Sequence, residues 1–349
     1  MYNYGNKATD NTDTPVPQSP ANISSVCISA QNMIAATTWD GQVCVWSDSG
    51  TSVQCKTSKK FNAPLLDIDW IGNFAAMASG DKSVLIWDPS SNQHKELGKV
   101  LPSRLARRTG SQTLRAEAAS EYGRKRKLGR HSPLLGHEVC SLTRRKEGEA
   151  MKCNVNERVY AMDSKSFVLA VGTAEKGLLV FDTRNPSNPV KTFASPLRLQ
   201  TSCVSVFSEL DGVCVGSIEG RISVKYFQND KFSVKLSASF NFKAHREKTQ
   251  NNQGELATSV NAIEFHPKAK MFVSGGSDGN IALWDKAAKQ RVKFFAKVPE
   301  AITDIAFNEN GSLMAYAMSY DYSQGKNAKN NPSSAVYLKR VTEKDFTAK

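Results

Sequence analysis

A short pattern that recurs along the chain limits its fold more than any other feature of the sequence. Each copy has a turn rich in Gly, Ser and Asp, and an acid in that turn is followed six residues later by an aromatic residue that closes an apolar run. The clear copies are TTWDGQVCVW (37–46), ASGDKSVLIW (78–87), GTAEKGLLVF (172–181) and GGSDGNIALW (275–284). Apolar runs joined by tight turns are typical of antiparallel strands. We therefore expect an all-β chain of repeated units, with hydrogen-bonding acids in the turns and the closing aromatic residues in the core.

The spacing of the copies indicates the size of the unit. With the relaxed copy GSIEGRISVKYF included, the turn acids are separated by 41, 94, 44 and 59 residues. They are Asp40, Asp81, Glu175, Glu219 and Asp278. A four-stranded propeller blade takes about 40 to 45 residues, so the interval of 94 has room for two. A closing copy at AITDIAFNENGSLMAYAMSYDY and SAVYLKRV brings the total to six visible blades and one slot. The sequence thus predicts seven blades. They are expected to close into a ring, because closure leaves only short, protected sheet edges.

One domain accounts for most of the chain under this prediction. We expect the propeller to span residues 21–343. The polar residues 1–20 are expected to be a disordered leader, and residues 344–349 a C-terminal tail. Residues 228–258 fill the long last interval and are expected to hold a polar insertion, read as an extra strand and a long polar loop.

Residues 96–152 occupy the slot of the third blade but lack the pattern of strands. Within them, residues 104–150 contain one valine, no isoleucine and no aspartate, which does not supply the alternating β-branched positions of a blade. Residues 101–152 hold 13 Lys and Arg against 5 Asp and Glu, which is +8 of the net charge of +13. Three interpretations stay open: a divergent or misread stretch, a disordered basic insertion whose RKRK (124–127) serves nuclear import or RNA binding, and a degenerate helical blade.

The distribution of reactive residues argues against an enzyme or a metal protein. The five histidines are scattered, and no acid, base and nucleophile form a catalytic string. His137, Cys140 and Cys153 have a partial metal-ligand pattern, but a fourth ligand is missing, so we expect no metal and no cofactor. The seven cysteines are scattered in apolar runs and the N-terminus lacks the features of a secretory signal, which favours reduced thiols in the cytosol or nucleus. No stretch approaches the roughly 18 apolar residues of a membrane span.

Several strings of the sequence resemble a known family. SGGSDGNIALWDK and TTWDGQVCVW resemble WD-repeat motifs. AVGTAEKGLLVFD, SPLRLQTSCVSVF, GSIEGRISVKY, FNFKAHRE, VNAIEFHP and SYDYSQG are similar to segments of the Gle/Rae family of mRNA export factors and of its relative, the Bub-type checkpoint propeller. SPLRLQTSCV, TAEKGLLVF and SYDYSQG favour the export factor, whereas VFDTRNP leans towards the checkpoint protein. The fold that this resemblance implies is a seven-bladed WD-repeat β-propeller with a degenerate third blade.

The resemblance also implies a non-catalytic adaptor. Members of the family bind a short acidic motif, called GLEBS, that an FG nucleoporin or a checkpoint kinase carries, and the motif lies across one face of the propeller. For this chain it implies support of mRNA export through the nuclear pore, with RNA or messenger ribonucleoprotein as a further candidate partner that would suit the net positive charge. The expected location is the nucleus, its pores and its envelope, with a fraction in the cytoplasm. The alternative is a Bub-type spindle-checkpoint scaffold that binds kinase-borne motifs at kinetochores.

Four residues are the candidate partner contacts under this resemblance. Arg246 in FKAHRE and Arg291 in WDKAAKQRVK match basic positions that pair with glutamates of the motif, and an arginine can hold a carboxylate with two parallel hydrogen bonds. Lys243, in the same FNFKAHRE string, is a further candidate. Trp39 matches a tryptophan often found in the first-blade turn of the family and is expected to supply an apolar contact.

Overall fold

The structure is a computed structural model dominated by β-strands. It describes these parts of the 349-residue chain: 13–99, 113–117, 137–143, 151–155, 157–185, 187–227, 239–248, 254–323 and 333–346. No helix within these ranges is long and apolar enough to cross a membrane.

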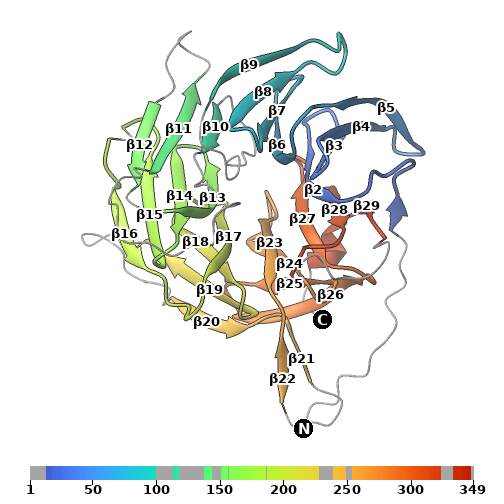
Figure 1. Ribbon diagram of the computed structural model, residues 1–349. Helices are drawn as coiled ribbons and strands as arrows, with labels where there is room; N and C mark the ends of the chain where they lie inside the picture. Colours follow the sequence, from blue (N-terminus) through green and yellow to red (C-terminus); the bar gives the residue numbers. More distant parts are fainter. Residues whose placement is uncertain are drawn as a thin grey trace, which may run out of the picture.

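In the described residues, six antiparallel sheets of four strands stand around a common axis (Figure 1). The first two consist of β2 (Ile23–Ile28), β3 (Met33–Thr38), β4 (Gln42–Asp48) and β5 (Val53–Lys60), then β6 (Leu65–Ile71), β7 (Phe74–Ser79), β8 (Ser83–Trp87) and β9 (His94–Lys99). The next two consist of β13 (Val159–Lys165), β14 (Val168–Thr173), β15 (Gly177–Asp182) and β16 (Lys191–Ala194), then β17 (Thr201–Val206), β18 (Gly212–Ser217), β19 (Arg221–Tyr226) and β20 (Phe240–Lys243). The last two consist of β23 (Val260–Phe265), β24 (Met271–Gly276), β25 (Asn280–Asp285) and β26 (Gln290–Lys297), then β27 (Ile302–Phe307), β28 (Leu313–Met318), β29 (Ala335–Arg340) and β1 (Thr14–Pro15). The predicted all-β propeller is confirmed for these six blades.

The burial of each strand follows from its place in a blade. The second strand is covered on both faces, as in β14, β18 and β28, where every residue is buried. These strands are continuous runs of small and apolar residues, which is the pattern of a strand packed on both sides. The outer strand β5 instead alternates between half-buried and exposed residues. The closing aromatic residues predicted for the core are buried, with exposed fractions of 0% for Trp46 and 5% for Trp284.

The turn between the second and third strands packs against the connection to the next blade. Gly279, between β24 and β25, has a φ of +71°, and a Cβ there would lie 2.2 Å from the carbonyl oxygen of Val298. The same carbonyl-to-glycine approach recurs at Gly220, where a Cβ would lie 2.3 Å from the oxygen of His245. Only glycine adopts this conformation without a steric penalty. The end of the propeller formed by these turns and connections is called the loop face below.

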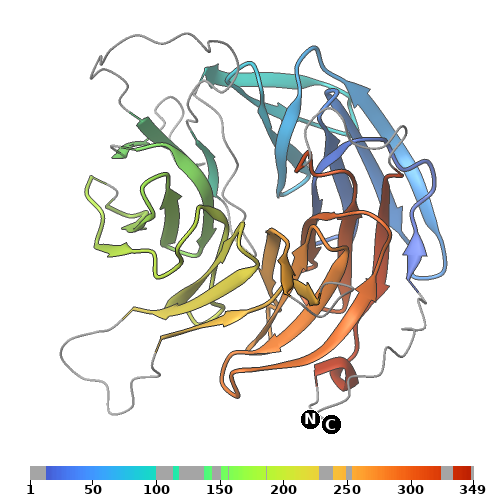
Figure 2. The same ribbon diagram turned by 60° about the horizontal axis from the view of Figure 1, so that its bottom comes forward.

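The N-terminal strand β1 completes the last blade. It pairs with β29 in the register Thr14 to Leu338, and the indole N–H of Trp46 donates to the carbonyl of Pro17 over 2.8 Å. Figure 2 shows the last blade, in orange and red, lying next to the first, in blue. Residues 1–20 were predicted to be a disordered leader, but from Asp13 onwards the chain is ordered against the last blade. A two-residue strand carries no readable periodicity, and its partner is more than 300 residues away in the chain.

A three-stranded sheet begins in the stretch 96–152 that lacked the strand pattern, and its last strand runs on to Val155. It is made of β10 (Thr113–Glu117), β11 (His137–Thr143) and β12 (Met151–Val155), and Figure 1 places it between the β6–β9 and β13–β16 blades. These strands form although the stretch does not supply the alternating β-branched pattern of a blade. The RKRK run at 124–127 lies outside the described residues, as do the side chains of the three residues with the partial metal-ligand pattern.

Two further boundaries differ from the sequence prediction. The predicted polar insertion 228–258 contains the outer strand β20 and a two-stranded ribbon formed by β21 (Arg246–Lys248) and β22 (Glu255–Ala257). The predicted tail contains most of the 3₁₀-helix η2 (Glu343–Phe346), whose Phe346 ring packs 4.3 Å from the imidazole of His266. Both segments are fixed by contacts with residues far away in the chain, which local composition does not reveal.

Candidate partner-binding face

A buried hydrogen-bonded chain fixes the loop face between the β17–β20 and β23–β26 blades. The indole N–H of Trp284 donates to the hydroxyl of Ser274 over 2.8 Å, and this hydroxyl lies 2.8 Å from Nε2 of His245. Nδ1 of His245 lies 2.9 Å from Oδ1 of Asp278. Burial alone raises the pKa of Asp278, but the hydrogen bonds from His245 and Asn280 outweigh burial and hold this pKa below its usual value. The carboxylate therefore stays charged and holds the imidazole in place.

His245 in turn anchors the base of the β21–β22 ribbon. The carbonyl oxygen of His245 accepts hydrogen bonds from the backbone N–H and the hydroxyl of Thr258, each over 3.2 Å. The ribbon pairs Arg246 with Ala257 and Lys248 with Glu255. Since Arg246 follows directly after the buried histidine, the position of its side chain depends on this anchor.

Lys243 and Arg246 are brought together by one carboxylate. Nζ of Lys243 donates to Oε2 of Glu255 over 2.7 Å, and Nη1 of Arg246 donates to the same oxygen over 3.4 Å. Nη2 of Arg246 donates to the carbonyl oxygen of Glu219 over 3.0 Å, and Nε of Arg246 is buried without a hydrogen-bond partner in the described structure. The hydrogen bond from Lys243 is the main cause that holds the pKa of Glu255 below its usual value. The site is thus a pair of cations that already accommodates a glutamate.

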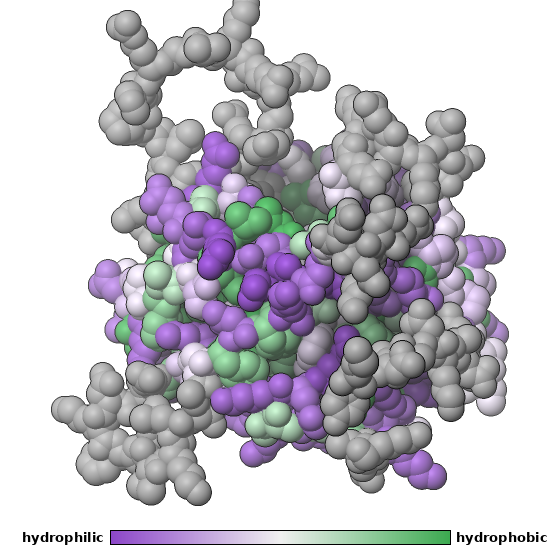
Figure 3. All heavy atoms as spheres, turned by 90° about the horizontal axis from the view of Figure 1, so that it is seen from below, coloured by the Kyte–Doolittle hydropathy of each residue, from purple (hydrophilic) through white to green (hydrophobic). Residues whose placement is uncertain are grey.

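Three exposed aliphatic side chains lie in segments at the same end of the propeller. Leu199 precedes β17, Ile218 lies in the β18–β19 turn, and Leu256 lies on β22. Their exposed fractions are 48%, 44% and 57%. Seen from below the view of Figure 1, hydrophilic residues cover most of the described surface, with small hydrophobic patches between them (Figure 3). A cationic pair beside isolated aliphatic residues suits a peptide that alternates acidic and apolar side chains.

Trp39 also lies on the loop face, but at a different blade. It occupies the β3–β4 turn, is 43% exposed, and meets the ring of Tyr322 edge-on at a centroid distance of 6.0 Å. Tyr322 follows Asp321, whose carboxylate accepts hydrogen bonds from Ser277 and from the amide of Asn261. These contacts fix the aromatic pair at the junction of the first and last blades.

Arg291 is not brought together with the other predicted residues. It lies near the start of β26, opposite Trp284 in the register, whereas the loop-face end of β26 is Lys297, opposite Asn280. Its guanidinium carbon lies 4.2 Å from the centroid of the Phe294 ring. Most of the length of β26 therefore lies between Arg291 and the loop face, where Arg246 stands.

A small cavity that no sequence motif predicted lies next to the Arg291 end of β26. It is lined by Phe240, Phe242, Phe272, Trp284, Asp285, Lys286, Lys289 and Gln290. The Phe242 and Trp284 ring centroids are 4.6 Å apart, and Nζ of Lys289 lies 5.1 Å from the centroid of the Phe240 ring. The alternation of aromatic residues in FNF, on an outer strand, was the available signal. The cavity combines aromatic faces with a cationic rim.

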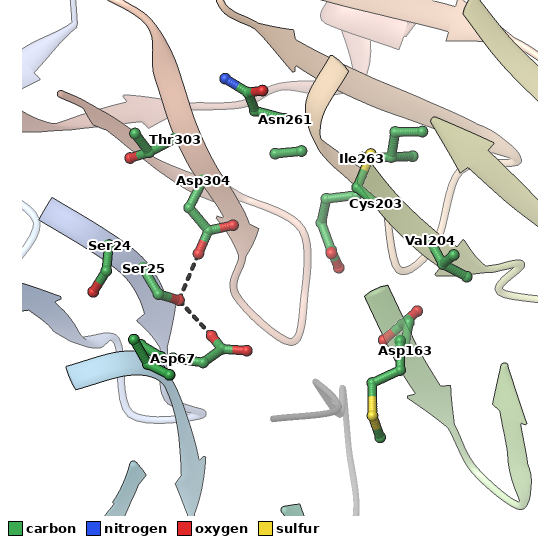
Figure 4. Close-up of a pocket in the computed structure, with 14 residues that line it drawn as sticks. Ser24, Ser25, Asp67, Asp163, Cys203, Val204, Asn261, Ile263, Thr303 and Asp304 are labelled. Atoms are coloured by element: carbon green, nitrogen blue, oxygen red, sulfur yellow. Dashed lines mark hydrogen bonds between the residues drawn. The ribbon is translucent and has the colours of Figure 1, made fainter. Parts of the chain in front are cut away.

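The central channel is lined by acidic side chains from several inner strands (Figure 4). The hydroxyl of Ser25 lies 2.6 Å from Oδ1 of Asp67 and 2.6 Å from Oδ2 of Asp304. Oδ2 of Asp304 also accepts the backbone N–H of Val26 over 2.9 Å, and Oδ2 of Asp163 accepts that of a residue of the neighbouring β17. These carboxylates join the inner strands of neighbouring blades. Among the described residues, no group of three or more His, Cys, Asp or Glu side chains is arranged to hold a metal ion.

Comparison with known proteins gives consistent matches. The family described as WD domain, G-beta repeat matches residues 247–285. The chain is 32% identical to the mRNA export factor GLE2 of Chaetomium thermophilum over 323 residues, which are 91% of this chain and 82% of that protein. It is 31% identical to protein RAE1 of Arabidopsis thaliana, over 100% of this chain and 97% of that protein. It is 30% identical to the poly(A)+ RNA export protein of Schizosaccharomyces pombe, over 90% of this chain and 86% of that protein.

Proposed function

The chain belongs to the Gle2/Rae1 family of mRNA export factors, and we propose on this basis that it acts in mRNA export at the nuclear pore as a non-catalytic adaptor. Relatives that share most of its length carry the name of mRNA export factors. A propeller whose inner carboxylates hold neighbouring blades together suits a scaffold. The proposed location is the nucleus and its pores, with a fraction in the cytoplasm.

The proposed partner is an acidic GLEBS-type motif carried by an FG nucleoporin, bound at Lys243 and Arg246. The observation that carries this proposal is the shared contact of both cations with Glu255, because it demonstrates a position where a glutamate oxygen meets both side chains. Arg246 is only 20% exposed, and a charged hydrogen bond is stronger where water is partly excluded. Trp39 is proposed as an apolar contact further along the same face.

RNA is proposed as a second ligand, at the aromatic cavity beside β26. Single-stranded nucleic acids are bound by aromatic faces on which bases stack and by cations that meet the phosphates. Phe240 and Phe242 supply the aromatic faces, and Lys289 supplies the cation. Arg291 follows the lining residue Gln290 in the sequence. Arg291 is thus proposed as a partner contact on the outer side of the blade, separate from the acidic-motif site.

We also propose that the ring closes with seven blades, with β10–β12 as the degenerate third. Val155, the last residue of β12, is 2% exposed and packs in one core cluster with Val159, Met162 and Phe181 of the β13–β16 blade. This contact supports a sheet that is part of the ring. A blade in this slot would cover the sides of the two blades that flank it.

A calorimetric titration with synthetic GLEBS-type peptides from a nucleoporin and from a checkpoint kinase tests the adaptor proposal. Arg246→Glu is expected to weaken nucleoporin-peptide binding at least tenfold, because it places a like charge at the site. Arg184→Glu is the matched control, since Arg184 is exposed and pairs with Asp182 at the opposite end of its blade. Equal effects of the two substitutions would contradict the assigned site, and binding of the kinase peptide alone would favour the checkpoint scaffold.

A further inference from the structure

The carboxylate that joins Lys243 and Arg246 belongs to the chain itself. Glu255 lies on β22, on a ribbon of three residue pairs, and its side chain is 39% exposed. Its oxygen Oε2 accepts both cations, so the chain places a glutamate where the proposed function requires one from a partner. The contact thus neutralises part of the positive charge of the proposed binding site.

The geometry satisfies Arg246 incompletely. Its Nη1 lies 3.4 Å from Glu255, close to the limit of a hydrogen bond, whereas Nζ of Lys243 lies at 2.7 Å. Nε of Arg246 is buried without a partner in the described part of the chain. A guanidinium binds a carboxylate best through two parallel hydrogen bonds, and Glu255 does not provide that arrangement. A carboxylate from outside that approaches Arg246 directly would make the better contact.

The ribbon is held mainly at its base. Thr258 bonds to the carbonyl of His245 there, while every residue of β22 is exposed. The shorter ion pair of Glu255 is that with Lys243, and the side chains of Lys243 and Glu255 are 51% and 39% exposed. Exposed ion pairs contribute little to stability, because water and salt screen them and two long side chains must be ordered. Displacement of Glu255 from the two cations therefore has a small energetic cost.

We propose that Glu255 is an internal competitor that occupies the Lys243–Arg246 pair in the free protein and is displaced when an acidic partner binds. This inference rests on the proposed function of that site. A resident carboxylate lowers the apparent affinity for the partner, because only the molecules in which the cation pair is free can bind it. It thereby disfavours ligands that offer only scattered negative charge, and favours a partner whose carboxylate reaches Arg246 bidentately.

The test is a fluorescence-anisotropy titration of the full chain with a labelled GLEBS-type nucleoporin peptide. We expect Glu255→Gln, and Glu255→Ala as a second variant, to bind the peptide about three- to tenfold more tightly than the wild type. Glu247→Gln is the matched control: it changes the same charge on the same ribbon, but Glu247 pairs with Lys297 at 2.6 Å. We expect its effect to stay under about twofold.

Three other outcomes would overturn the inference, and they differ in what else they affect. In the first, the wild type binds the peptide and both Glu255 variants bind it with the same or lower affinity. Glu255 is then inert or orients the cations, and the proposed function stays intact. An equal gain in Glu247→Gln means that only net charge matters. No binding by the wild type or by either Glu255 variant removes the proposed function together with the inference.

Discussion

Replacing Asp278 by alanine removes the acceptor at the end of the chain Trp284–Ser274–His245. The carboxylate is 3% exposed and accepts Nδ1 of His245 at 2.9 Å, the backbone N–H of Asn280 at 3.1 Å and the side-chain amide of Asn280 at 2.8 Å. A hydrogen bond to a charged group contributes about 1.5–3 kcal/mol, and a buried donor left without a partner costs about 1–3 kcal/mol. We therefore expect Asp278→Ala to lower the free energy of unfolding by about 3 kcal/mol.

The matched control is Asp81→Ala, at the same turn position of another blade. Asp81 is exposed and accepts the backbone N–H and the hydroxyl of Ser83, at 3.0 and 2.7 Å, and the hydroxyl of Ser79. Hydrogen bonds at an exposed carboxylate contribute less than buried ones, so its loss should cost roughly 1 kcal/mol. An unfolding entropy of about 2.1 cal/mol/K per residue gives about 0.7 kcal/mol/K for this chain. Thermal melting should thus show Tm lowered by about 4 °C for Asp278→Ala and by 1 to 2 °C for Asp81→Ala. Equal shifts would refute the structural role assigned to the buried histidine contact.

Three further predictions concern the ring closure, the pH dependence and the RNA site. Nζ of Lys339, whose side chain is 12% exposed, lies 2.6 Å from Oδ1 of Asp13. Asp13→Ala leaves this cation without its partner, so it should lower the free energy of unfolding by about 3 kcal/mol and expose β1 to proteolysis. Burial is the main cause that lowers the pKa of His266, so the fold favours the neutral ring; stability is complete above the unfolded pKa of about 6.5 and declines as pH falls below it. The fall in Tm from about pH 7.5 to about pH 5.5 should therefore be smaller in His266→Gln, and an equal fall would contradict this. Lys289→Ala should weaken oligo(U) binding in a filter assay at least threefold. Lys56→Ala is the control and should not, because Lys56 is an exposed residue of β5 and is not among the residues that line the cavity; equal losses would refute the RNA site.

The elements that the sequence predicted are those fixed by local pattern. The closing tryptophans and the turn acids recur at a constant spacing, since each blade repeats the same turn against the same neighbour. The strand β1 could not be predicted, because two residues carry no periodicity and their partner lies at Leu338. Local composition also gave no sign of β10–β12, because the strands stand in a stretch poor in β-branched residues.

The candidate site was predicted in part. Arg246 and Lys243 share one carboxylate, but Glu255 was missed because only the pairing of β21 with β22 brings it near them. Arg291 was grouped with Arg246 because both match basic positions of the family that the chain resembles. The repeat itself predicts where Arg291 lies. Arg291 follows the closing Trp284 by seven positions, so it stands near the start of the outer strand, at the end of the blade opposite the loop face.

The central claim is that Arg246 meets a glutamate of an acidic nucleoporin motif, and a charge-swap titration tests it most directly. The wild type and Arg246→Glu are each titrated with a GLEBS-type peptide and with peptides in which single glutamates are replaced by lysine. We expect one of the lysine peptides to restore binding to Arg246→Glu while it binds the wild type more weakly. Binding to Arg246→Glu that no lysine substitution improves would contradict the claim.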